Sequence, residues 1–107
     1  ALSFGLAAEV RYDRYYPATI NHAAPVEHAL AAGRCACRQA VLAPEPAFTS
    51  EDFAFMLQVK PGAYAWLGQG EGGEATPLHH PRYDFNDAVL PFGLGWHVAL
   101  AEQRLAA

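Results

Sequence analysis

Prolines and glycines divide this chain into short segments, and this limits each segment to one short helix or strand. Pro17 and Gly33 each stand where an element should end, and so does the Lys-Pro-Gly sequence at 60–62. Pro44 and Pro46 should keep the connection between two elements extended. Proline removes a backbone donor and fixes φ, and glycine tolerates the conformations that end helices. We therefore expect short elements whose packing decides the fold.

Between these breaks the side-chain pattern predicts both helices and strands. Asn21 and Pro25 are typical of the first turn of a helix, and Thr49 and Ser50 are good N-caps for a second one. The expected helices cover about 21–33, 49–60 and 91–105, and the expected strands cover 7–16 and 63–67, with 35–42 as a further candidate. The last helix should be mostly buried, with Leu94, Val98, Ala101 and Leu105 on one face and with Trp96 and Leu100 widening the apolar surface.

This order of elements predicts an α/β fold. A single strand in the middle of the chain, at 63–67, cannot form a sheet by itself. Its neighbours must be either 7–16 and 35–42 within the chain or strands from sequence outside it.

The composition excludes some partners and predicts an uncovered surface. Of 107 residues, 52% are hydrophobic and 17% are charged, a balance that a small monomer cannot easily bury. The net charge is −4, and the 7 Lys and Arg form no run, which argues against a nucleic acid partner. No apolar stretch approaches the ~20 residues that span a bilayer, and residues 1–8 lack the basic flank of a signal peptide. We expect no membrane association and a soluble, cytoplasmic protein.

The two cysteines, Cys35 and Cys37, are separated by one residue. In a strand this spacing points them to opposite faces, where a mutual disulfide would be strained. A zinc knuckle normally has two intervening residues and a second ligand pair. We interpret both as small apolar side chains in or near a strand.

Several short motifs follow one another along the second half of the chain. They are Phe-Thr-Ser-Glu-Asp-Phe-Ala-Phe at 48–55, Pro-Gly-Ala-Tyr at 61–64, Leu-Gly at 67–68 and Leu-His-His-Pro-Arg-Tyr-Asp-Phe-Asn-Asp at 78–87. They resemble the closing motifs of M20 peptidases, in particular amidohydrolases of the hippurate hydrolase and aminoacylase type. The sequence Tyr-Pro-Ala-Thr-Ile-Asn at 16–21 is similar to the family's return from its lid, or dimerisation, domain to its metal-binding domain.

The resemblance implies a domain division and a function. Residues 1–20 would be the last strand of the lid domain and the hinge, and residues 21–107 the C-terminal part of the catalytic metal-binding domain. Family members use two divalent metal ions, commonly zinc or manganese, to hydrolyse N-acyl amino acids such as hippurate. The metals polarise the scissile carbonyl and lower the pKa of a bridging water.

The resemblance also assigns site residues. His79 matches the metal ligand of the family's histidine, any residue, proline pattern, and His80 fills the variable position, either as a second ligand or as a supporting histidine. Glu51 either shapes the substrate pocket or only favours the helix start by its charge. Asn21 is either a hinge residue at the pocket or a plain helix cap. Gly68 begins a glycine-rich loop, 68–73, near the site.

The other ligands of the family are missing from this sequence, and so is its catalytic glutamate. One imidazole cannot hold a catalytic zinc. We therefore expect no catalytic residue in this chain and no activity from the chain alone. We expect it to bind a metal ion only together with ligands from other sequence. An unpaired first strand invites pairing with another copy, which predicts a homo-oligomer. Two alternatives remain: a truncated, non-catalytic assembly module, and an independent metal site of His79, His80 and His97.

Overall fold

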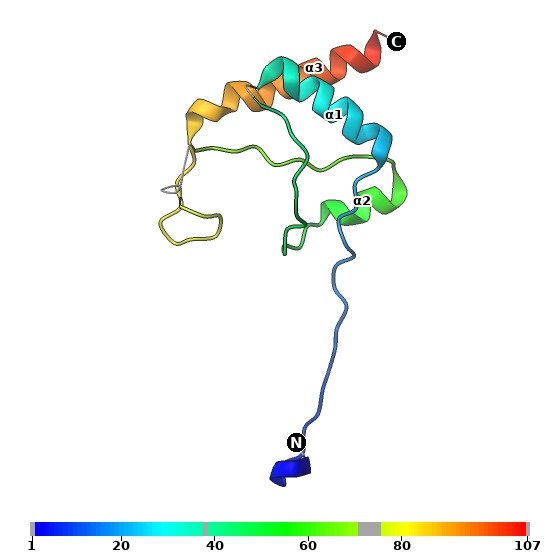
Figure 1. Cartoon of the computed structure of the whole chain (residues 1–107), viewed down its shortest axis with the longest axis vertical. Helices are drawn as coiled ribbons and strands as arrows, with labels where there is room; N and C mark the ends of the chain where they lie inside the picture. Colours follow the sequence, from blue (N-terminus) through cyan, green and yellow to red (C-terminus); the bar gives the residue numbers. More distant parts are fainter. Residues whose placement is uncertain (1, 38, 71–75, 107) are drawn as a thin grey trace.

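A computed structural model describes residues 2–37, 39–70 and 76–106. Its elements are a 3-10 turn η1 (Leu2–Phe4), helix α1 (Ala23–Ala36), helix α2 (Phe53–Val59), a 3-10 turn η2 (Asp87–Val89) and helix α3 (Leu90–Leu105) (Figure 1). None of the described residues forms a strand, so the expected strands at 7–16, 35–42 and 63–67, and with them the α/β sheet, are wrong for this chain as it stands. The physical reason is that an extended segment becomes a strand only when a neighbour pairs with its backbone.

Helix α1 begins after His22, with Pro25 in its first turn as predicted. The prediction that Gly33 ends the helix is wrong. Gly33 is buried inside α1, and a Cβ at this position would lie 2.7 Å from the Cβ of Ala40. Glycine is therefore required here for close packing. Cys35 consequently lies in the last helical turn and not in a strand.

Helices α1 and α3 pack against each other (Figure 1). The indole Nε1 of Trp96 donates a hydrogen bond of 2.9 Å to the carbonyl of Ala29, and a guanidinium nitrogen of Arg104 lies 3.1 Å from the Nε2 of His28. The expected buried face of α3 is wrong, because Leu94 is 69% exposed, and Val98 and Leu105 are exposed too. The part of the expected apolar surface that carries Trp96 does meet α1.

Helix α2 begins at Phe53, with Asp52 as N-cap and no side-chain capping bond, so Thr49 and Ser50 are not its caps. The predicted stop is confirmed, since the N–H of Lys60 donates to the Met56 carbonyl and a proline and a glycine follow. Ala54 and Leu57 are the buried residues of this helix.

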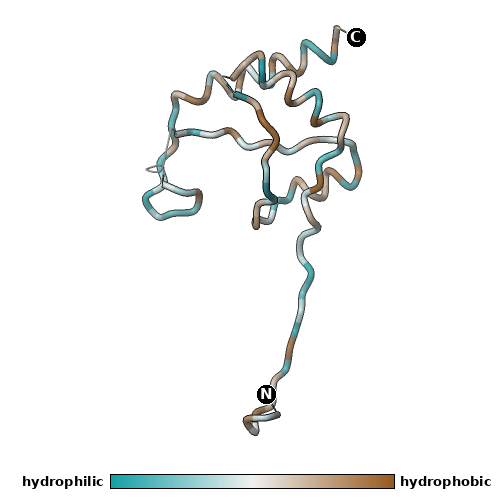
Figure 2. Tube along the Cα trace, viewed as in Figure 1, coloured by the Kyte–Doolittle hydropathy of each residue, from teal (hydrophilic) through white to brown (hydrophobic). Residues whose placement is uncertain are grey.

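The predicted uncovered surface is confirmed. The radius of gyration is 19.1 Å, against about 13 Å for a compact domain of this length. The accessible surface is 9483 Å², against roughly 5,800 Å² for a folded monomer of this mass. Hydrophobic positions appear along much of the trace, including the extended N-terminal arm, residues 6–20 (Figures 1 and 2). In the described part of the chain, no helix is long and apolar enough to cross a membrane.

Candidate functional site

Four hydrogen bonds join the start of α1 to the segment that follows α2, and we call this arrangement the hinge clamp: Asn21, His22, Gly62 and Tyr64. The Nδ2 of Asn21 donates to the Tyr64 carbonyl over 2.9 Å, and the Tyr64 N–H donates to the Asn21 Oδ1 over 2.7 Å. The His22 N–H donates to the Gly62 carbonyl over 3.0 Å, and the Gly62 N–H donates to the His22 Nδ1 over 3.2 Å. Both ends of the clamp are therefore fixed by reciprocal bonds.

The clamp shows that Asn21 is not the N-cap of α1. The N-cap of α1 is His22, whose side chain makes no capping bond, and the amide of Asn21 is occupied by the Tyr64 backbone 43 residues away. Asn21 thus connects two distant segments at the expected hinge and does not cap the helix.

Tyr64 also links the clamp to Glu51. Partial burial, a hydrogen bond with Glu51, and the negative charges of Glu51 and Asp52 raise the pKa of the Tyr64 hydroxyl above its ordinary value. The Tyr64 ring packs against Phe53 at 5.6 Å and against Trp66 edge-on at 5.8 Å, measured between ring centroids. Asn21 is therefore bonded to the backbone of the tyrosine whose pKa Glu51 helps to raise. Sequence reasoning assigned Tyr64 no role, although it ends the Pro-Gly-Ala-Tyr motif.

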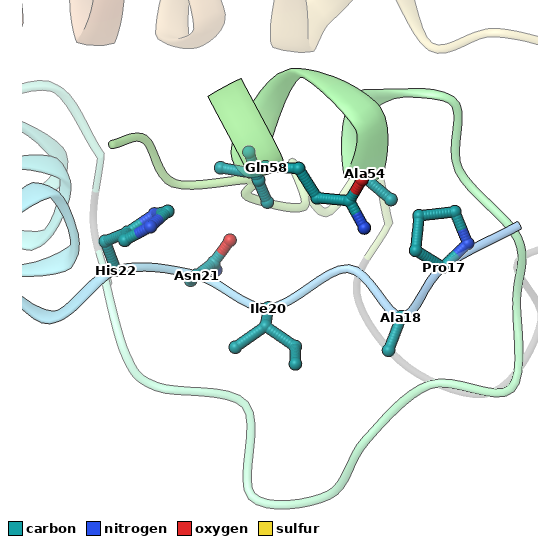
Figure 3. Close-up of a pocket in the computed structure, with 8 residues that line it drawn as sticks. Pro17, Ala18, Ile20, Asn21, His22, Ala54 and Gln58 are labelled. Atoms are coloured by element: carbon teal, nitrogen blue, oxygen red, sulfur yellow. The ribbon is translucent and has the colours of Figure 1, made fainter. Parts of the chain in front are cut away.

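A groove of about 380 Å³ lies beside the clamp, between the arm and α2. Its lining is mostly apolar, with polar groups from Asn21, His22 and Gln58. Figure 3 shows the side chains of Ile20 and Ala18 pointing away from α2, whereas the amide of Asn21 points toward it. The alternation is that of an extended chain, which explains how Asn21 reaches Tyr64 while its neighbour Ile20 stays 71% exposed.

Gly68 is exposed, and a Cβ at its position would meet nothing within 4 Å. The next residue, Gln69, is held by Asn86, whose Nδ2 donates to the Gln69 carbonyl over 2.9 Å and whose N–H donates to the Gln69 Oε1 over 3.3 Å. Asn86 also caps η2 through the Ala88 N–H. The beginning of the glycine-rich loop is thereby attached to the start of α3. Residues 71–73 of the expected loop lie outside the described residues.

His79 stands in an exposed turn with a φ of 67°, in the left-handed region that a residue with a side chain seldom adopts. His80 has a different environment: it is half-buried, and its Nδ1 accepts a hydrogen bond of 3.1 Å from the Arg82 N–H. His97 stacks beside Trp96, at 4.9 Å between ring centroids.

Potential ligands do not gather around His79. Among residues 2–37, 39–70 and 76–106, no group of three or more His, Cys, Asp or Glu side chains could hold a metal ion. The described residues therefore offer no complete metal site, and Cys35 and Cys37 are both free thiols. The structure gives no support to an independent site of His79, His80 and His97.

Comparison with known proteins gives a consistent answer. A probable hydrolase of Synechocystis is 36% identical over 96 residues, which cover 86% of this chain and 24% of the relative. YhaA of Bacillus subtilis, whose name describes an amidohydrolase, is 30% identical over 80% of this chain and 22% of its own length. An IAA-amino acid hydrolase of Arabidopsis thaliana is 35% identical over 64% of this chain and 16% of its own length.

This chain spans about a quarter or less of the length of these relatives. No solved structure matches it. The family model described as peptidase family M20/M25/M40 matches residues 7–103, which is nearly the whole chain. The chain belongs to the M20/M25/M40 peptidase family.

Proposed function

We propose that this chain is the C-terminal segment of a metal-dependent amidohydrolase that cleaves N-acyl amino acids of the hippurate type. The observation that carries the proposal is the family match over residues 7–103, which includes the motif of His79. The names of its relatives, among them an IAA-amino acid hydrolase and an N-acetyldiaminopimelate deacetylase of Streptococcus suis, describe hydrolysis of acylated amino acids or removal of an acyl group. The two free cysteines suit the reducing cytoplasm, where we place the enzyme.

In this proposal the chain contributes to two domains. Residues 1–20, which form no strand in this structure, would become the last strand of the lid domain and the hinge in the complete enzyme, and residues 21–107 would belong to the metal-binding domain. The hinge clamp lies at this boundary, since Asn21 and His22 tie the end of the arm to Gly62 and Tyr64. Through these hydrogen bonds, a movement of the arm would also move the segment that follows α2, at the pocket wall.

His79 would be the one ligand that this chain gives to a pair of zinc or manganese ions, and the remaining donors would come from other sequence. Its exposed ring on a left-handed turn suits donation to a site built jointly with another segment. Bound metal ions would polarise the scissile carbonyl and activate water. Glu51, Asn21 and Gly68 would line the substrate side, with Glu51 and Asn21 held in register by Tyr64.

The experiment measures metal retention and hydrolysis together. The complement protein is the Synechocystis hydrolase with the segment matching this chain deleted. We expect the chain alone to bind neither zinc nor manganese in the micromolar range and not to hydrolyse hippurate. Its mixture with the complement protein should retain metal after gel filtration, as measured by elemental analysis. His79→Ala should lower that metal content, and His97→Ala should not. Hippurate turnover by the chain alone, or equal metal content with His79→Ala, would contradict the proposal.

A second candidate is a non-catalytic assembly module that forms homo-oligomers. The large exposed apolar surface favours it, with Phe48 fully exposed and Val10 88% exposed. Sedimentation separates the two candidates. A module should form one stable oligomer on its own, whereas a segment of an amidohydrolase should become homogeneous only with its complement.

A further inference from the structure

The turn that carries His79 is held in shape by its own hydrogen bonds, and we call residues 77–83 the His79 turn. The His80 N–H donates to the Pro77 carbonyl over 3.1 Å, and the Tyr83 N–H donates to the His80 carbonyl over 2.9 Å. Among the described residues, every hydrogen bond of the His79 turn stays within it. These bonds give the turn a defined shape, but they do not fix where it lies relative to the helices.

Asn86 is the first residue after the His79 turn that is bonded to a distant part of the described chain. Its Nδ2 donates to the Gln69 carbonyl over 2.9 Å, and its N–H donates to the Gln69 Oε1 over 3.3 Å. Each side chain is thus bonded to the backbone of the other residue. The Oδ1 of Asn86 accepts the Ala88 N–H over 3.1 Å. Because both ends of the Asn86 amide are occupied, the amide cannot turn over without losing both of its side-chain bonds.

The Gln69–Asn86 pair is attached to α3 from both sides. After Asn86 the chain continues through η2 into α3. Before Gln69, the Cδ2 of Leu67 lies 3.2 Å from where a Cβ of Gly93 in α3 would stand, so this segment lies close against the helix. The two residues of the pair are 17 positions apart in the sequence, and the His79 turn lies between them. Joining the two ends of a stretch of chain restricts the positions that the stretch can reach.

We propose that Asn86 is a positioning residue, which through Gln69 holds the His79 turn in place for a metal ion. This inference rests on the proposed function, since it takes His79 to be a metal ligand. Groups that orient a ligand affect the affinity for the metal although they do not touch it. Helix capping alone does not account for Asn86, because the cap uses only its Oδ1, whereas its Nδ2 is bonded to Gln69.

Asn86→Asp separates the positioning role from the cap. The carboxylate keeps an oxygen for the Ala88 N–H, and its negative charge suits the start of a helix, so α3 should be at least as stable as before. The carboxylate has no N–H for the Gln69 carbonyl. Gln69→Met removes the acceptor of the Asn86 N–H at similar size, whereas Gln69→Glu retains an acceptor oxygen. Gln103→Met makes the same change near the end of α3 and is the matched control.

The test has two readouts, both on the full 107-residue chain. For the chain alone, backbone amide relaxation by NMR measures the fast motion of the His79 turn. Asn86→Asp and Gln69→Met should increase this motion, and Gln69→Glu and Gln103→Met should not. For the mixture with the complement protein defined above, titration measures the Kd for zinc. Asn86→Asp should raise this Kd about fivefold, as expected for one exposed hydrogen bond, and Gln69→Glu should not change it.

Two results would overturn the proposal. One is unchanged motion of the His79 turn in both Asn86→Asp and Gln69→Met. The other is an unchanged Kd for zinc in Asn86→Asp while His79→Ala weakens zinc binding, which would leave the proposed function standing because His79 would still be a ligand. If the wild-type mixture binds no zinc, or if His79→Ala does not weaken the binding, the proposed function fails and the positioning role fails with it.

Discussion

Tyr64 is the residue on which the interactions of the candidate site converge. Its backbone is bonded twice to Asn21, its ring packs on Phe53 and Trp66, and Glu51 contributes to the raised pKa of its hydroxyl. These contacts join residues from three separate parts of the sequence. A substitution at any of these residues should therefore change the position or the stability of Tyr64.

Asn21→Ala should loosen the segment after α2. The substitution removes both hydrogen bonds to the Tyr64 backbone. Because the bonds are exposed, their joint loss should cost about 1 kcal/mol, which is roughly a fivefold faster opening of the Tyr64 amide. Amide exchange at Tyr64 measures this. Ile20→Ala, at a side chain that points away from α2, is the control, and an equal effect there would remove the clamp from the explanation.

Tyr64 should ionise at a higher pH than an ordinary tyrosine, because its pKa is raised. Its folded pKa is raised by partial burial and then by Glu51 and Asp52, so the folded state holds the proton more tightly than the unfolded state. The associated stability is complete below about pH 10 and is lost as pH rises through the folded pKa. Absorbance at tyrosinate wavelengths should show a late phase that Tyr64→Phe removes and Glu51→Gln shifts to lower pH. A late phase that survives Tyr64→Phe would refute the assignment.

At the scale of elements, the helices could be predicted and the strands could not. Each helix is specified locally, by the proline in the first turn of α1, the Lys-Pro-Gly stop after α2 and the apolar run of α3. The segment 63–67 has a strand composition, but a strand also requires a partner, and composition does not show whether that partner is present. The prediction that Gly33 ends α1 failed for a related reason. Glycine commonly ends a helix, but here it lies inside the helix, where it packs close to Trp96 and Ala40.

Two glycine substitutions test how α1 and α3 pack. In a helix interior, alanine is normally more stable than glycine by about 1 kcal/mol. At Gly33 the new Cβ would stand 2.7 Å from the Cβ of Ala40, so Gly33→Ala should destabilise the chain by about 1–3 kcal/mol. At Gly95 the nearest atom, the Cβ of Ala36, is 3.4 Å away, so Gly95→Ala should be neutral or stabilising. Urea unfolding followed by circular dichroism measures both, and equal effects would contradict this packing.

At the scale of the whole molecule, the site is incomplete. The motif of His79 could be predicted to supply a ligand, and the structure places that histidine on an exposed turn. The position of the metal could not be predicted, because the described residues hold no second and third donor beside it. The same shortage affects the fold, because residues 63–67 run extended and none of the described residues pairs with them as a strand. The match to this chain covers 24% of the Synechocystis relative, and the proposed enzyme depends on the rest of such a protein for its other ligands.

The N-terminal arm gives the last prediction, because the ion pair found among its described residues cannot hold it in place. Arg11 contacts Asp13 at 2.9 Å, but both side chains are exposed, and such a surface pair contributes about 0–1 kcal/mol. Trypsin should therefore cut after Arg11 and Arg14 long before it cuts after Arg34 in α1 or Arg104, which is bonded to His28. Mass spectrometry identifies the cuts, and the helical circular dichroism should persist after they occur. Early cleavage in α1 or α3, or loss of the helical signal with the arm, would show that the arm is part of the folded core.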